Sequence, residues 1–175
     1  MNEPPSPTLT TTADALVVVG ADEQDDTPVD VARWTALAEA VLRDEHRRGE
    51  LTLTFVDAEE MADLNSAHLG HEGPTDVLSF PLDTQDVTGV PVLIGDVVVC
   101  PAVAAAQASL HAGTLDDELA LLIVHGILHV LGHDHAADGE RTRMQSRERE
   151  LLERHHWHGP APAGFRQDHG DQEHQ

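Results

Sequence analysis

At 175 residues, the chain is long enough for one compact domain with its own core, but short for two. Its 40% hydrophobic content excludes a wholly disordered chain, and its 3% aromatic content indicates a core of aliphatic side chains. The formal net charge of −22 argues against non-specific attraction to nucleic acid or to an anionic membrane.

The sequence contains no signal for export or membrane insertion. Its longest apolar stretch, residues 119–131, is shorter than the roughly 20 residues of a membrane-spanning helix and is interrupted by two histidines. All the charged side chains before the first arginine, Arg33, are acidic, which is the opposite of the pattern in a cationic signal peptide. The lone cysteine, Cys100, allows no internal disulfide. We therefore expect a cytoplasmic protein.

Three regions are expected along the chain. Residues 1–13 are rich in Pro, Ser, Thr and Glu, and residues 159–175 in Gly, Pro, Gln, His and Asp, so both tails are predicted to be disordered. Residues 14–158 carry turn signals at intervals typical of short strands and medium helices. They predict a single α+β domain, a small mixed β-sheet packed by about five helices.

Apolar periodicity and capping residues place the elements. In chain order they are a strand over 15–19, a helix over 31–48, a strand over 51–56, a helix over 58–68, strands over 77–80 and 93–99, and helices over 101–112, 115–131 and 139–155. Asp30, Asp57 and Thr114 are the predicted N-caps, and Gly49 is the predicted stop of the first long helix. The helix over 115–131 is apolar on most sides, which predicts a central position against the sheet.

Two histidines interrupt this central helix. His125 and His129 are four residues apart, so they lie one turn apart on the same side and can converge on one ion. Gly132 lets the chain turn back sharply, which brings His135 to a third position. Three imidazoles with one open position are typical of catalytic zinc, whereas structural zinc is usually closed by four ligands. The sequence predicts one zinc ion per chain, bound by His125, His129 and His135.

Two other interpretations of this pattern are chance pairing of histidines and a metalloprotease motif. Among 13 histidines some pairs fall four apart by chance, but unpartnered imidazoles inside an apolar helix would each cost about 1–3 kcal/mol. The spacing also matches the long metzincin motif, in which a glutamate general base follows the first histidine. Gly126 occupies that position here, which disfavours a metalloprotease.

Three further motifs accompany the zinc segment. They are Gly-Pro-Thr-Asp-Val-Leu-Ser-Phe-Pro at 73–81, Ile-Gly-Asp-Val at 94–97, and Glu118 seven residues before His125. Together with the zinc segment, these motifs resemble those of the YbeY family of bacterial rRNA maturation factors. The resemblance implies a metal-dependent single-strand endoribonuclease acting in 16S rRNA 3′-end processing and ribosome quality control. It also implies the same three zinc ligands, an rRNA precursor as substrate, and a small-subunit ribosomal protein or an assembly GTPase as partner.

One position departs from the family pattern. Many members carry an arginine in the loop before Pro-Thr-Asp, thought to face the substrate phosphate, and the corresponding residue here is Leu69. Leucine forms no charge-assisted bond to a phosphodiester. His68 and His71 flank it and are candidates to substitute for it. Ser79 and Asp96 are candidates to line the approach to the ion, with a structural role in turns or strand ends as the alternative.

The catalytic group itself is left open, apart from a water activated by zinc. Leu69 and the acidic composition favour a second hypothesis, a ribosome-associated assembly factor in which zinc is structural and catalysis is slight or absent. The least acidic stretch is the last helix, where Arg143, Arg147 and Arg154 share one side. These arginines either contact phosphate or pair with neighbouring glutamates.

Overall fold

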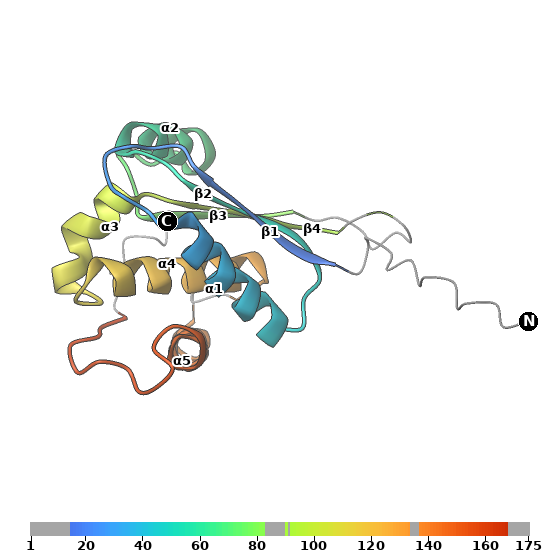
Figure 1. The fold of residues 1–175 in the computed structure, drawn as a ribbon. Helices are drawn as coiled ribbons and strands as arrows, with labels where there is room; N and C mark the ends of the chain where they lie inside the picture. The colour runs from blue at the N-terminus through green and yellow to red at the C-terminus, as the bar shows by residue number, and fades with distance from the viewer. Residues whose placement is uncertain (1–14, 83–89, 91, 134–136, 168–175) are drawn as a thin grey trace, which may run out of the picture.

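The computed structural model describes residues 15–82, 90, 92–133 and 137–167, and it confirms the predicted α+β architecture (Figure 1). The elements of the described residues are β1 Leu16–Asp22, α1 Val31–Asp44, β2 Gly49–Phe55, α2 Ala58–Leu69, β3 Val77–Pro81, β4 Leu93–Val99, α3 Pro101–Gln107, the short 3-10 helix η2 Ala108–Leu110, α4 Leu115–Val130 and α5 Asp138–His155. Each predicted helix and strand has a counterpart among them.

The four strands form one mixed sheet in the order β1-β2-β4-β3. β1, β2 and β4 run parallel, and β3 pairs antiparallel with β4. Along β2, Leu51, Leu53 and Phe55 are buried while the residues between them are half-buried, as period-2 alternation requires. Helices α1 and α4 cover one face of this sheet, and α2 lies across the other (Figure 1).

Helix α4 lies at the centre of the domain. Almost all of its residues are buried, and it contacts β3, β4, α1 and α5. At Gly126 the helix comes very close to the sheet, since a Cβ there would lie 2.8 Å from Val97 Cγ1 and 3.2 Å from Val77 Cγ2. Gly126 is therefore a packing residue, and it lies on the side of α4 that faces the strands.

The predicted caps are confirmed. The side chains of Asp30, Asp57 and Thr114 each accept a hydrogen bond from the backbone N–H three residues further on. Each bond satisfies one of the donors that a helix leaves free at its first turn. Local sequence alone therefore fixes where α1, α2 and α4 begin.

The predicted end of the first helix was wrong. Helix α1 ends at Asp44, five residues before Gly49, and Gly49 begins β2 instead. Gly49 has a φ of 118°, and a Cβ there would lie 2.3 Å from the carbonyl oxygen of Val92. Glycine is required at this position by the close approach of a neighbouring chain segment, and it does not stop the helix.

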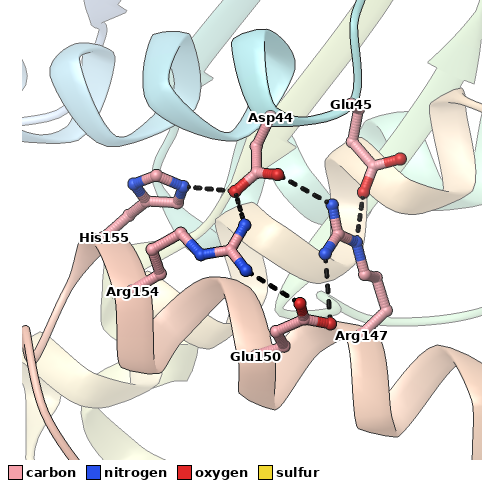
Figure 2. A network of polar contacts seen from close by, with 6 residues as sticks. All are labelled: Asp44, Glu45, Arg147, Glu150, Arg154 and His155. Carbon is pink, nitrogen blue, oxygen red and sulfur yellow. Dashed lines mark hydrogen bonds and ion pairs between the residues drawn. The ribbon is translucent and has the colours of Figure 1, made fainter.

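The end of α1 is held by helix α5 (Figure 2). Asp44 accepts hydrogen bonds from His155, Arg154 and Arg147, while Arg147 Nε donates to Glu45 Oε1 at 2.6 Å. These bonds, led by that from His155, hold the pKa of Asp44 well below its usual range. Six side chains make up this surface ion network: Asp44, Glu45, Arg147, Glu150, Arg154 and His155.

The C-terminal tail, predicted to be disordered from residue 159, is described as far as Gln167. Phe165 packs edge-on against Trp157 at 4.8 Å between ring centroids, and the backbone N–H of Arg166 donates to His111 O at 3.1 Å. The predicted N-terminal tail, residues 1–13, lies outside the described residues. In the part of the chain that the structure describes, no helix is both long enough and apolar enough to cross a bilayer.

Candidate metal centre

A cleft of about 700 Å³ opens where helix α4 passes β3. His125 and His129 of α4 line it together with Ser79 and other residues of β3. The remaining wall comes from the end of α2, the loop after it, α3 and the turn that follows: Asn65, Leu69, His71, Glu72, Pro74, Thr75, Asp76, Val103, Gln107 and His111. A cavity of this size is typical of small-ligand sites.

The two histidines of α4 converge at this cleft. His125 Nε2 and His129 Nε2 lie 3.1 Å apart, with the ring planes inclined at 76°. Two nitrogens that bind the same tetrahedral zinc at about 2.0–2.1 Å would lie about 3.3 Å from each other. The spacing of the two imidazoles therefore fits a shared zinc ion.

A buried carboxylate lies behind the first histidine. Glu148 of α5 places its Oε1 2.6 Å from His125 Nδ1, and both side chains are almost completely buried, at 2% and 7% exposed. A carboxylate can only accept, so Nδ1 of His125 carries the shared proton. In the neutral imidazole this leaves the lone pair on Nε2, the atom that faces His129.

The third predicted ligand, His135, lies outside the described residues. The turn that leads toward it is described: Gly132 has a φ of 98°, and the N–H of His133 donates to Leu128 O at 2.9 Å. Glycine was predicted here for this turn. Within the described residues alone, no three His, Cys, Asp or Glu side chains form a metal-binding group.

Cys100 does not contribute a ligand to this cleft. Its side chain is fully buried, packed with Val56, Met61 and Leu78 on the α2 side of the sheet. Burial raises the pKa of the Cys100 thiol, which disfavours the thiolate that binds metals. A thiolate ligand from Cys100 is therefore excluded at this cleft.

An amide of the cleft lining joins two buried carboxylates, Asp76 of the lining and Glu118 of α4. Gln107 Nε2 donates to Asp76 Oδ2 at 2.7 Å and to Glu118 Oε1 at 3.0 Å. Glu118 is fully buried and also accepts from the backbone N–H of Ala112, while His111 Nδ1 lies 3.5 Å from its Oε1. This polar network fixes the loop before β3 against the start of α4.

The structure separates the candidate cleft residues into two groups. Ser79 and His71 line the cleft, and the hydroxyl of Ser79 donates to the backbone oxygen of Gly126 at 3.0 Å. His68 instead packs against the ring of Phe80 at 4.9 Å between centroids, and it is not among the lining residues. Asp96 pairs with Phe80 in the sheet register and also lies outside the lining, because alternation turns it away from α4.

The position of the family arginine also lies at the cleft. Leu69 is 54% exposed and lines it, and none of the described lining residues is an arginine or lysine. Arg147 and Arg154 do not fill this role, because the surface ion network engages both of them. Histidines are therefore the only basic side chains among the described residues that line the cleft.

Glu148 and Gln107 are among the residues of the site that sequence reasoning missed. A signal for Glu148 was present, because it follows Met144 by four residues and precedes Leu151 and Leu152 by three and four. It thus shares the narrow apolar side of α5, and all four residues are buried. Gln107 gave no such signal, since its partners come from two other segments.

A mixed sheet packed by a buried helix that presents two histidines to an open cleft defines an α+β domain with a candidate catalytic metal centre. The family model described as "Endoribonuclease YbeY" matches residues 20–156. The chain belongs to the YbeY family.

Individual relatives agree with this assignment. "Endoribonuclease YbeY" of Beutenbergia cavernae is 45% identical over 131 residues, covering 71% of this chain and 87% of the relative. The protein of the same name from Mycolicibacterium vanbaalenii is 38% identical over 163 residues, covering 89% and 85%. Among solved structures, the solution structure of TM1509 from Thermotoga maritima matches with a TM-score of 0.54 at 25% identity, covering 81% of this chain and 92% of that one.

Proposed function

We propose that this chain is a zinc-dependent endoribonuclease that cuts single-stranded RNA in the cytoplasm and acts in 16S rRNA 3′-end processing and ribosome quality control. The observation that carries the proposal is the pair of imidazoles, 3.1 Å apart between their Nε2 atoms, that lines the cleft of a YbeY-family domain. A bound zinc ion supplies Lewis-acid chemistry, activating water near neutral pH and stabilising negative charge on phosphate oxygens.

The residues of the chain divide the work of this site. The ion is held by His125, His129 and His135. Glu148 keeps the proton of His125 on Nδ1, the nitrogen that faces away from the ion. His71 and His111 line the cleft and can donate hydrogen bonds to phosphate oxygens or to the leaving oxygen. The substrate is an rRNA precursor, and DNA and membranes are not ligands.

A specific observation favours a second candidate function. The cleft carries Leu69 where many family members carry arginine, and the carboxylates of Glu72 and Asp76 lie in the same lining. Such a wall repels phosphate. A ribosome-associated assembly factor with structural zinc, docked on a small-subunit ribosomal protein or an assembly GTPase, would need no cleavage.

Cleavage of a defined, end-labelled single-stranded RNA by zinc-loaded protein tests the proposal. We expect zinc-dependent cleavage by the wild type, none by His129→Ala, and little cleavage of the same sequence in a duplex. His133→Ala is the matched control, because it removes a neighbouring imidazole that is not a predicted ligand.

The substitution Leu69→Arg separates the two candidate functions. A guanidinium at the cleft would stabilise developing charge on the phosphate, and one such donor is worth roughly 10²-fold in rate. We expect faster cleavage at unchanged zinc content. If both the wild type and Leu69→Arg are inactive with zinc bound and the fold intact, the nuclease proposal fails and the assembly-factor function remains.

A further inference from the structure

Behind the two histidines, a hydrogen-bonded chain runs from the cleft into the C-terminal segment. His125 Nδ1 bonds to Glu148 Oε1 at 2.6 Å, and the other carboxylate oxygen, Oε2, accepts from Gln167 Nε2 at 3.2 Å. Gln167 is itself tied down, because the same nitrogen donates to the backbone oxygen of Gln145 at 2.7 Å. The chain links α4, α5 and the segment that follows α5.

Glu148 is unusual among the carboxylates of helix α5. It is 1% exposed, whereas Glu150, two residues further on, is exposed and belongs to the surface ion network. An uncompensated carboxylate at such a position would be costly, so its bonds to His125 and Gln167 are required. The bond to His125 is buried and the bond to Gln167 is partly buried, and both serve to fix one imidazole.

We propose that Glu148 is a positioning residue of the metal centre, held by Gln167, and that it sets the tautomer and orientation of His125; this rests on the proposed function only in that the ion is zinc. The carboxylate keeps the proton on Nδ1 and so directs the Nε2 lone pair into the cleft. A metal-binding histidine whose other nitrogen is bonded to a carboxylate is a stronger and better oriented ligand.

The C-terminal segment becomes part of the site on this account. Gln167 completes the hydrogen-bonded chain on one side of the cleft, and Arg166 N donates to the backbone oxygen of His111, which lines the other side. Packing of Phe165 against Trp157 fixes the segment just before the two residues that make these bonds. Residues 157–167 therefore support the metal centre from behind.

Zinc affinity, measured by competition with a chromogenic chelator, tests the role of Glu148. We expect Glu148→Gln to weaken zinc binding by about 10–100-fold, the usual effect of losing such an outer partner. Gln167→Ala should weaken it less, by a few-fold, because Glu148 keeps its bond to His125. Glu150→Gln is the matched control on the same helix and should bind zinc as the wild type does.

The tautomer of His125 in the metal-free protein is a second, independent readout, available from long-range ¹H–¹⁵N correlation spectra of the imidazoles. We expect the Nδ1–H form in the wild type, and a mixture of forms in Glu148→Gln. Wild-type zinc affinity in Glu148→Gln, or an Nε2–H form in the wild type, would overturn the inference. A wild type that binds no zinc would refute the proposed function instead, while the tautomer would still decide the role of Glu148.

Discussion

Helix α5 carries two charged clusters that differ in burial and in what they touch. Arg147 points to the C-terminal end of α1 and belongs to the surface ion network, whereas Glu148, the next residue, points inward to His125. The side chain of Arg147 is 23% exposed and that of Glu148 only 2%. Neighbouring residues on one helix thus face two different places, the end of α1 and the candidate metal centre.

The comparison shows that pairing of charged side chains has one role at the surface and another in the interior. Exposed ion pairs contribute little each, since water screens them, and here several combine to set the position of α5. A buried pair costs desolvation, which is accepted where a specific geometry is needed. We therefore expect substitutions in the surface ion network to change stability, and substitutions around His125 to change metal binding.

The largest expected effect is at the buried cluster itself. His129→Ala removes a ligand, so zinc affinity should fall by more than the roughly 10–100-fold caused by loss of an outer partner. Zinc content of dialysed protein, measured by elemental analysis, checks this. Equal zinc in the wild type, His125→Ala and His129→Ala would break the comparison, because the two histidines of α4 would then not be zinc ligands.

A packing change beside the same cluster should affect stability. Gly126→Ala places a Cβ 2.8 Å from Val97 Cγ1, a branched side chain that cannot move aside easily, so we expect a loss of about 1–3 kcal/mol in the free energy of unfolding. Urea denaturation measures it. The control is Gly139→Ala in the first turn of α5, where no atom lies within 4 Å of a new Cβ and the change should be neutral or slightly stabilising.

Asp44→Asn tests the surface ion network at its centre. We expect a loss of about 1–2 kcal/mol at neutral pH with unchanged zinc affinity, since Asp44 accepts from two guanidinium groups and one imidazole. The exposed Asp63 of α2 provides the control Asp63→Asn, which should leave stability near that of the wild type. A changed zinc affinity in Asp44→Asn would show that the two clusters are coupled.

The effect of Asp44→Asn should depend on pH in one direction. The pKa of Asp44 is lowered in the folded protein, so its stabilisation is fully present above the unfolded value of about 3.9 and is lost as the pH falls below that. The difference between wild type and variant should therefore shrink on acidification below about pH 4. A difference that grows there would contradict the assignment.

The smallest expected effect is at the outer side of α5. Arg149 is 54% exposed and pairs with Glu153 one turn away, at 3.3 Å between Nε and Oε1. Such pairs contribute about 0.3–0.5 kcal/mol, so Arg149→Ala should change the unfolding free energy by no more than this. A larger loss in urea denaturation would mean that the outer side of α5 also holds the fold together.

Local signals in the sequence predicted most of the framework. Asp30, Asp57 and Thr114 act on groups three residues away, so the helix starts that they cap could be placed from sequence alone. His125 and His129 are likewise neighbours on one helix, and their convergence followed from spacing. These features depend on short-range geometry.

What the sequence did not predict depends on partners far along the chain. Glu148 lies 23 residues from His125, and Arg147 lies 103 from Asp44, where α1 ends earlier than expected. Asp96 was a candidate to line the approach to the ion, with a structural role as the alternative, and strand alternation turns it to the other face. Which residues meet across the sheet and between helices is decided by tertiary packing, which spacing within one element does not encode.

The most direct test of the central claim is zinc X-ray absorption spectroscopy of the protein loaded with one equivalent of zinc. The account predicts a first shell of nitrogen and oxygen only, with Zn–N distances of about 2.0–2.1 Å and outer-shell scattering from three imidazoles. A sulfur ligand at about 2.3 Å, or scattering from fewer than three imidazoles, would contradict the assignment of His125, His129 and His135.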